Sequence, residues 1–144
     1  MDNDVIIRRA EAKDLNEIYY LVCELENEQL DYDKFGRIYN ENVKNPEYAY
    51  FIVLADDEVI GFISLHTQNL LHHCGRVGEI QEFIIHKKFR NAGIGKKLMA
   101  EIDKFSLNNI TDLEVTSNKK RTENVKIYEK LGFKLTHNKF TRKL

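Results

Sequence analysis

The stretch GEIQEFIIHKKFRNAGIGKKLMAEIDKF, residues 78–105, decides the fold of this 144-residue chain. Its first part, residues 78–86, is rich in strand-forming side chains and predicts a β-strand. A turn with two glycines follows at residues 90–95, and beyond it the apolar side chains recur at helical spacing, at Ile94, Leu98, Ile102 and Phe105. The stretch is therefore predicted to form a strand, a glycine turn and an amphipathic helix.

A glycine turn in this setting can hold a phosphate group. Two glycines let successive backbone N–H groups point into one concavity, and the helix adds its own free N–H groups and the positive end of its dipole. Two other phosphate motifs do not fit. A dinucleotide fingerprint beginning at Gly93 needs a third glycine where Leu98 stands, and a P-loop ending in Gly95-Lys96 needs a glycine where Arg90 stands and Ser or Thr where Lys97 stands.

The rest of the chain predicts one domain, residues 1–144, with an α+β fold in which a mixed sheet carries helices on its faces. Asp14 is expected to cap the first helix together with Glu17. Residues 67–76 are expected to form a polar, histidine-rich loop, and the tail is expected to add one or two closing strands. The other expected elements are, in order, a strand at 5–7, helices at 15–25 and 32–43, strands at 48–55, 59–66, 78–86 and 111–116, and a helix through Val125 and Leu131 that ends at Gly132.

Composition excludes several classes of function. The chain has 22 basic and 23 acidic residues and no basic arm, which argues against nucleic-acid binding. Its apolar runs are too short to cross a membrane, and its start lacks the pattern of a secretory signal. The two cysteines do not form a disulfide framework, so a cytoplasmic protein is expected.

Two separate segments resemble the GNAT N-acetyltransferase superfamily. The first is the turn Arg90-x-x-Gly93-x-Gly95, and the second combines Thr116-Ser117-Asn118 with the helix end Tyr128-Glu129-Lys130-Leu131-Gly132-Phe133. The resemblance implies a mostly antiparallel sheet with splayed central strands and helices on both faces, and acetyl-CoA as co-substrate. It also implies that coenzyme A is bound by Asn118, by the backbone of Phe83, Ile84 and Ile85, and by the phosphate cradle Arg90, Asn91, Ala92, Gly93, Ile94, Gly95 and Lys96.

The same resemblance assigns the chemistry of acetyl transfer to an amine. Glu79, eleven residues before Arg90, matches the family position of the base that takes the amine proton, and Glu82 is expected to contact substrate. In a regular strand these two carboxylates face opposite ways, so they can share one role only if the strand contains a bulge. Tyr128 matches the general acid that protonates the departing sulfur; its alternative role is packing in the core. Transfer is expected to be direct, in a ternary complex, without an acyl-enzyme.

A closer likeness points to the acceptor. Several runs look like the bacterial aminoalkylphosphonate N-acetyltransferases, among them Leu65-His66, Leu71-His72-His73, Gly78-Glu79-Ile80-Gln81-Glu82 and the ending Phe140-Thr141-Arg142-Lys143-Leu144. This likeness implies a short aminophosphonate as acceptor and the use of a divalent cation. His66 and Arg76 are expected beside the acceptor. No metal site is assigned, because the adjacent His72 and His73 would face opposite ways on an extended strand.

Other functions stay open at this point. An amino-sugar phosphate or a polyamine is the alternative acceptor. The alternatives of a different class are a transcriptional regulator and a module that binds coenzyme A without turnover. A homodimer is also compatible with the resemblance, although the sequence shows no exposed apolar stripe that demands one.

Overall fold

A computed structural model describes residues 4–144 and shows a five-stranded sheet in the order β1-β2-β3-β4-β5. Successive strands pair antiparallel except β4 and β5, which are parallel. This confirms the predicted mixed, mostly antiparallel sheet. The strands are β1 (Val5–Arg9), β2 (Tyr48–Ala55), β3 (Glu58–Leu70), β4 (Gly75–Ile85) and β5 (Asp112–Val115).

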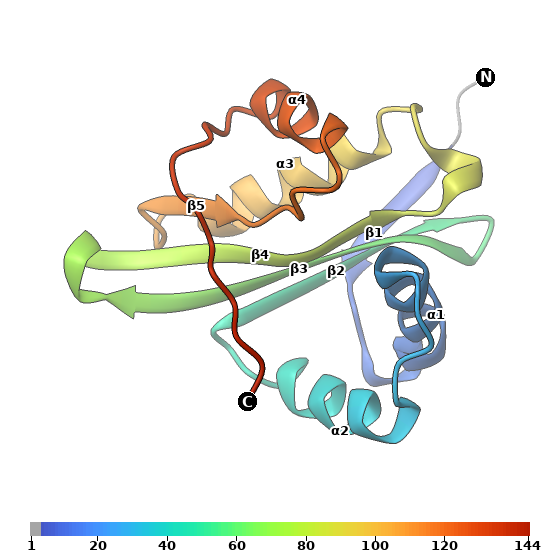
Figure 1. Cartoon of the computed structure of the whole chain (residues 1–144). Helices are drawn as coiled ribbons and strands as arrows, with labels where there is room; N and C mark the ends of the chain where they lie inside the picture. The colour runs from blue at the N-terminus through green and yellow to red at the C-terminus, as the bar shows by residue number, and fades with distance from the viewer. Residues whose placement is uncertain (1–3) are drawn as a thin grey trace.

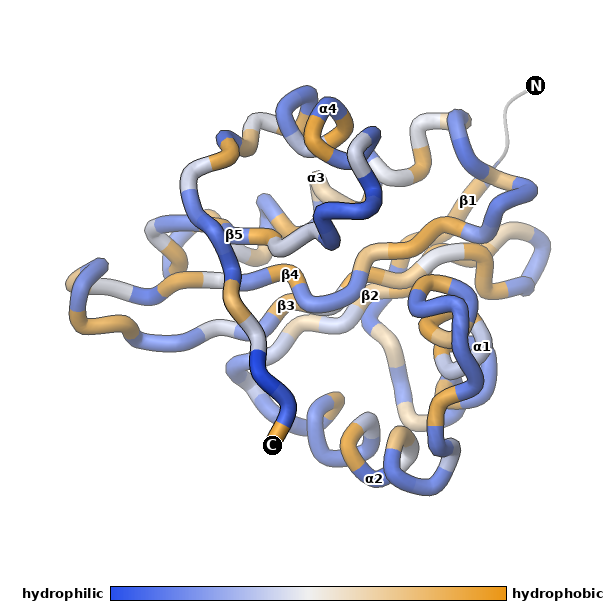
Figure 2. Tube along the Cα trace, viewed as in Figure 1, coloured by the Kyte–Doolittle hydropathy of each residue, from blue (hydrophilic) through white to orange (hydrophobic). Residues whose placement is uncertain are grey.

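Helices cover both faces of the sheet, as expected (Figure 1). On one face α1 (Leu15–Glu26) and α2 (Tyr32–Asn42) enclose an apolar core with β2, β3 and β4. On the other face α3 (Ile94–Ser106) packs a second core, and α4 (Glu123–Lys130) lies beside it. Figure 2 shows hydrophobic residues along the strands between these two layers. Among residues 4–144, no helix is long and apolar enough to cross a membrane.

The pairing between β4 and β5 ends halfway along β4. The parallel ladder joins only Val77–Ile80 to Asp112–Val115, whereas β3 continues to pair with β4 as far as Ile85. Beyond Ile80, the edge of β4 that faces β5 therefore lacks a strand partner among the described residues. This is the predicted splay of the central strands.

β4 also contains a bulge, which the regular alternation of a strand does not provide. The register with β3 runs Leu65↔Ile80 and then Ser64↔Glu82, so Gln81 is an extra residue. Glu79 lies opposite His66 and Glu82 opposite Ser64. Because His66 and Ser64 are two residues apart on β3, their partners Glu79 and Glu82 share one face of the sheet.

The hairpin of β3 and β4 is longer than predicted. Strand pairing continues to Leu70↔Gly75, and a short 3-10 turn at Leu71–His73 replaces most of the polar loop expected at residues 67–76. In Figure 1 this hairpin extends beyond the helices. The outer part of the hairpin is therefore exposed on both faces. Its residues lack the alternation of apolar and polar side chains that marks a half-buried strand, so the sequence pattern did not indicate these strand residues.

Asp14 is the N-cap residue of α1, as predicted, but its side chain does not cap the helix. The Asp14 carboxylate instead accepts two hydrogen bonds from the Arg8 guanidinium, at 2.8 and 2.9 Å, and one from the Glu11 backbone N–H at 2.7 Å. It makes no side-chain cap on α1. The arginine on the neighbouring strand competes successfully for the carboxylate, because a bidentate charged pair is stronger than a hydrogen bond to a backbone amide.

The closing strands predicted in the tail are not formed. Residues 134–144 contain no strand or helix and are all exposed. Leu135 is 76% exposed and Phe140 is 92% exposed. The alternating pattern of the tail favours a β-strand. A strand forms only where it can pair with the edge of a sheet, and the tail pairs with no edge of its own sheet.

Candidate active site

The glycine turn contains two residues in the left-handed backbone conformation. Gly93 is the residue before α3 and has φ of +79°, a left-handed conformation that favours glycine, and Asn91 has φ of +66°. The N–H groups of the first turn of α3 have no partner within the helix. A Cβ on Gly95 would lie 3.4 Å from the Phe83 ring, so this residue also allows the turn to approach β4 closely.

Arg90 holds this turn in place rather than pointing freely into it. Its Nε donates to the Ile85 carbonyl at 3.0 Å, and its guanidinium lies 3.4 Å from the Glu24 carboxylate of α1. Arg90 therefore ties the turn to the end of β4 and to α1. Lys96, on the first turn of α3, is exposed.

The residues predicted to line the coenzyme arm lie where β4 separates from β5. Ile84 is buried on the α1 and α2 face, whereas Phe83 and Ile85 pack on the α3 face. Asn118 is exposed; its side chain accepts from the Lys120 N–H at 2.9 Å, so it shapes the turn that precedes α4.

Tyr128 projects from α4 toward this opening. Its ring centroid lies 6.5 Å from that of Phe83 and 5.9 Å from that of Phe133. Burial raises the pKa of the Tyr128 hydroxyl, and nearby Arg121 opposes that rise. The hydroxyl therefore keeps its proton at neutral pH and can donate it.

The two carboxylates predicted for the acceptor side, Glu79 and Glu82, lie on the α1 and α2 face of the sheet. Glu82 is held by Ser64 through two contacts: the Ser64 hydroxyl donates to the Glu82 carboxylate, and it accepts from the Glu82 backbone N–H at 2.9 Å. Burial raises the pKa of Glu82; the Ser64 hydrogen bond lowers it, and the charge of Glu26 raises it further. Glu82 is thus a largely buried carboxyl that accepts a proton more readily than an exposed one.

Glu79 lies on the same face but is more open. Its carboxylate accepts from Gln81 Nε2 at 3.2 Å and from the Thr116 hydroxyl at 3.3 Å. The Thr116 contact comes from the end of β5, so Glu79 lies where the two central strands begin to separate. The bulge at Gln81 thus meets the condition under which the two carboxylates can serve one amine.

His66 joins this cluster through a chain of hydrogen bonds. Asn42 donates to the Tyr50 hydroxyl at 2.8 Å, and Tyr50 lies 3.1 Å from His66 Nε2. In the tautomer in which the Tyr50 hydroxyl donates to Nε2, Nδ1–H is the remaining donor of the ring. Burial lowers the pKa of His66 and Glu79 opposes the shift, so His66 is neutral near pH 7.

Sequence reasoning missed four residues of this cluster: Asn42, Tyr48, Tyr50 and Ser64. The His66 ring stacks on Tyr48 with centroids 3.7 Å apart. The alternation of Tyr48 and Tyr50 on one strand with Ser64 and His66 on the next could have revealed a shared face, because residues two apart on a strand point the same way. Asn42, on α2, carries no comparable signal.

The structure does not bring Arg76 to this cluster. Arg76 is two residues from Gly78, and the space beside Gly78 is filled by Leu65, Ile110 and Leu113 of the α3 face. Its guanidinium pairs with Glu47 at 2.6 Å. Arg76 therefore lies apart from Glu79, Glu82 and His66, because the face that it occupies is set by the strand register.

The residues present do not fit a resident metal ion. Within residues 4–144, no group of three or more His, Cys, Asp or Glu side chains has a suitable arrangement. His73 instead lies 2.9 Å from Asp112 and 3.4 Å from Glu114, so it fastens the hairpin to β5. His72 is exposed at the hairpin tip. No catalytic step is therefore derived through a metal.

A comparison with protein families decides the identity of this site. The model of the acetyltransferase (GNAT) family matches residues 9–133. The chain belongs to this family. As a GNAT enzyme it is an N-acetyltransferase that uses acetyl-CoA and acts on an amine.

Relatives of this GNAT enzyme agree in sequence and in fold. The aminoalkylphosphonate N-acetyltransferase of Salmonella typhimurium is 35% identical over 139 residues, which cover 96% of this chain and 90% of that protein. Among solved structures, aminoglycoside N-acetyltransferase AAC(6')-Iy in complex with CoA is 22% identical, with a TM-score of 0.87 and coverage of 99% of this chain and 97% of the other. A protein from Bacillus halodurans C-125 described as a transcriptional regulator is 21% identical, with a TM-score of 0.87 and coverage of 98% and 100%. At such identities the two structures show the fold alone.

Proposed function

We propose that this enzyme acetylates the primary amine of a short aminoalkylphosphonate by direct transfer from acetyl-CoA within a ternary complex. The sequence relationship with the Salmonella aminoalkylphosphonate enzyme supports the substrate class. The observation that carries the reaction type is the placement of Glu79 and Glu82 on one face, next to the splay of β4 and β5. Two carboxylates there can bind an ammonium group and remove its protons.

The proposed roles follow from position. The turn at residues 90–96 and the open edge of β4 hold the coenzyme, and Asn118 completes the loop beside it. A backbone N–H near Ile85 stabilises the tetrahedral oxyanion, because a fixed dipole there needs no rearrangement during the reaction. Glu79 lies on the proton path, and Tyr128 protonates the departing thiolate. An amine attacks the thioester directly, so an acyl-enzyme is not needed.

The two ends of an aminophosphonate require different surroundings. The carboxylates attract the ammonium end and repel the phosphonate, so we place the phosphonate toward His66. The Nδ1–H of neutral His66 is a hydrogen-bond donor that suits a phosphonate oxygen. Because Arg76 pairs with Glu47 on the opposite face, it takes no part in this assignment.

Release of free thiol from acetyl-CoA tests the proposal. The acceptors to compare are aminomethylphosphonate, 2-aminoethylphosphonate, an amino-sugar phosphate and a polyamine. We expect the two phosphonates to give the highest kcat/KM. A higher kcat/KM for the sugar phosphate or the polyamine would contradict the proposed aminoalkylphosphonate substrate and identify that compound's class instead. Coenzyme binding without turnover of any acceptor would indicate a non-catalytic module, and tight binding of labelled DNA without coenzyme binding would indicate a regulator.

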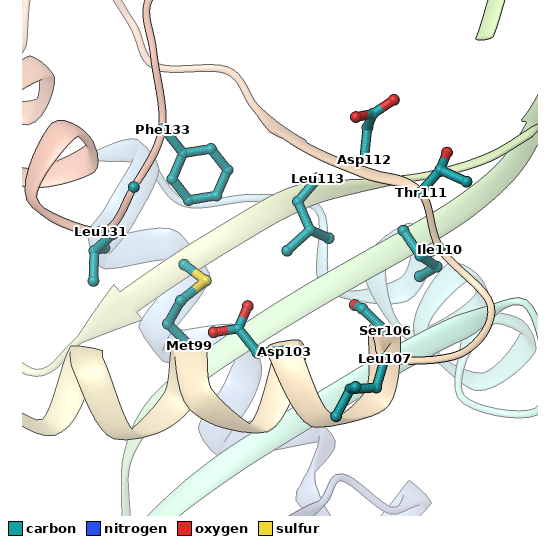
Figure 3. A pocket seen from close by; sticks show the side chains of 11 residues that line it. Met99, Asp103, Ser106, Leu107, Ile110, Thr111, Asp112, Leu113, Leu131 and Phe133 are labelled. Carbon is teal, nitrogen blue, oxygen red and sulfur yellow. The ribbon is translucent and has the colours of Figure 1, made fainter.

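We also propose that the enzyme is a homodimer in which each tail, residues 134–144, pairs with β5 of a second copy. Within residues 4–144, β5 pairs with β4 alone, so its other edge is open. Beside it lies a groove of about 410 Å³ between α3 and β5, whose lining includes the apolar side chains Met99, Leu107, Ile110 and Leu113 (Figure 3). A strand added to β5 would cover this groove.

The tail has the chemistry to fill that groove. It carries four basic and no acidic residues, and the groove contains Asp103 and Asp112. Its Phe140 is almost fully exposed, as is the groove residue Leu107, at 92% and 74% respectively. Burying both apolar side chains in an exchanged arrangement would remove this surface from water.

Light scattering after size-exclusion chromatography tests the dimer. We expect a dimeric mass for the full chain, and a monomeric mass for Phe140→Asp and for a chain that ends after Phe133. Ile6→Asp is the matched control, because Ile6 is 62% exposed on β1, at the opposite edge of the sheet. A monomeric full chain, or dissociation by Ile6→Asp but not by Phe140→Asp, would contradict the proposal.

A further inference from the structure

Ser64 and Glu82 form a closed two-residue arrangement within the sheet. The single Ser64 hydroxyl donates to the Glu82 carboxylate and accepts from the Glu82 backbone N–H. Ser64 is fully buried, and its register partner is Glu82 itself. Because the Ser64 hydroxyl both donates a hydrogen bond to Glu82 and accepts one from it, it holds the Glu82 carboxylate in one orientation.

This carboxylate is directed to the acceptor face by the bulge at Gln81. Without the extra residue, Glu82 would point to the face of α3 and Glu79 alone would meet the amine. With it, both carboxylates lie on the α1 and α2 face, and Glu82 is the more buried of the two. A bulge beside an active site commonly redirects a side chain in this way.

We propose that Glu82 is the catalytic residue that removes the first proton from the acceptor's ammonium group, and that Ser64 is its positioning residue. The inference rests on the proposed amine acetylation. It assigns the two proton transfers from the acceptor nitrogen to different carboxylates. Glu82 removes the first proton and so activates the amine, and Glu79 receives the second proton later in the reaction.

The proton balance gives each carboxylate one task. An ammonium acceptor loses two protons when it becomes an amide: one before the nitrogen attacks the thioester carbon, and one after the new C–N bond forms. Glu82 takes the first, which leaves a neutral amine with a free electron pair. The tetrahedral intermediate then expels the thiolate, which takes its proton from Tyr128. Glu79 takes the second nitrogen proton, and exchange with water restores Tyr128 and both carboxylates. Overall, one proton is bound to sulfur and one is released.

The surroundings of Glu82 suit a proton acceptor. Burial raises the pKa of its carboxyl, the Ser64 hydrogen bond opposes this, and Glu26 at the end of α1 raises it further. Other titratable groups on this face include Tyr39 on α2, Tyr48 and Tyr50 on β2, His66 on β3 and Glu79 on β4. Burial raises the pKa of Tyr50 to about 12, so it stays uncharged, and His66 is neutral near pH 7.

The dependence of kcat/KM on pH tests Ser64 and Glu82 together. Glu82 is active only when ionised, so activity falls on the acid side as its carboxyl gains a proton. Removing the hydroxyl with Ser64→Ala removes a hydrogen bond that favours the ionised form. We therefore expect the acid limb of the profile to move to higher pH by about one unit. The limb that reports the acceptor's own amine should not move.

Thr67→Val is the matched control. Thr67 is a buried hydroxyl residue on the same strand, 4% exposed, and its odd spacing from Ser64 places it on the opposite face. Its replacement should leave the acid limb in place. An unmoved limb in Ser64→Ala would overturn the positioning role.

Two carboxyl variants test the assignment of the base. Glu82→Gln should lower kcat/KM by about 10²-fold or more and remove the acid limb, because the amide cannot accept the proton. Glu79→Gln should lower the rate but keep the limb. If the limb disappears in Glu79→Gln and persists in Glu82→Gln, Glu79 is the base and this proposal is wrong. Amine acetylation itself fails only if the wild-type enzyme turns over no acceptor.

Discussion

Replacing Tyr128 with phenylalanine is expected to lower kcat by about a hundredfold or more while the affinity for coenzyme A stays near the wild-type value. The hydroxyl is partly buried and keeps its proton at neutral pH, since burial raises its pKa. The ring itself packs against Phe83 and Phe133, and phenylalanine preserves both contacts. The variant should therefore fold and bind coenzyme but release thiolate slowly. Steady-state kinetics with the preferred acceptor, together with calorimetric titration of coenzyme A, measure the two effects.

Tyr32→Phe is the control for this substitution. Its hydroxyl bonds to Asn16 on the surface between α1 and α2, and phenylalanine removes that hydroxyl without touching the splay. It should retain kcat. A Tyr128→Phe enzyme with wild-type kcat would show that the tyrosine serves packing alone.

Replacing Gly93 with valine is expected to weaken coenzyme binding by roughly ten- to a hundredfold. Gly93 has φ of +79°, and a β-branched residue there costs about 1–2 kcal/mol or distorts the turn. Either outcome disturbs the alignment of the N–H groups on which the phosphate cradle depends, and each 1.4 kcal/mol lost is a tenfold change in Kd. Nothing lies within 4 Å of a Cβ at this position, so the effect comes from the backbone rather than from a clash.

Asn91→Gly is the control in the same turn, because it places glycine at a position with positive φ instead of removing it. Asn91 also has a positive φ, of +66°, and glycine adopts that conformation without strain. Its coenzyme affinity should match the wild type. If Gly93→Val and the wild type bound coenzyme A with equal affinity, this turn would not be part of the coenzyme site.

The sequence predicted the parts of the fold that local patterns determine. The strand, glycine turn and helix of residues 78–105 are confirmed, because alternation, glycine content and helical spacing all act within a few residues. The mixed sheet with helices on its faces, predicted from the order of the elements, is confirmed as well, apart from the closing strands of the tail. The roles of Glu79, Glu82 and Tyr128 stay predictions, although their positions around the splay are compatible with those roles.

Pairing between strands accounts for what could not be predicted. The bulge at Gln81 has no glycine or proline to announce it, and only its register with Ser64 and Leu65 shows that it exists. The same register places Arg76 on the face opposite to Glu79, Glu82 and His66. The partner of the Asp14 side chain was missed for a related reason, since Arg8 lies on β1 and not in α1, the helix whose N-cap is Asp14.

If coenzyme A pairs with the open edge of β4, as proposed, it acts as an additional strand that the sheet gains on binding and loses on release. In the empty enzyme the β5-facing amide hydrogens of residues 81–85 have no strand partner, so they should exchange rapidly with deuterium, and bound coenzyme should slow that exchange. Because coenzyme binds only the folded chain, its concentration also adds to the free energy of unfolding. The resistance of this enzyme to proteolysis should thus rise and fall with the cell's supply of acetyl-CoA.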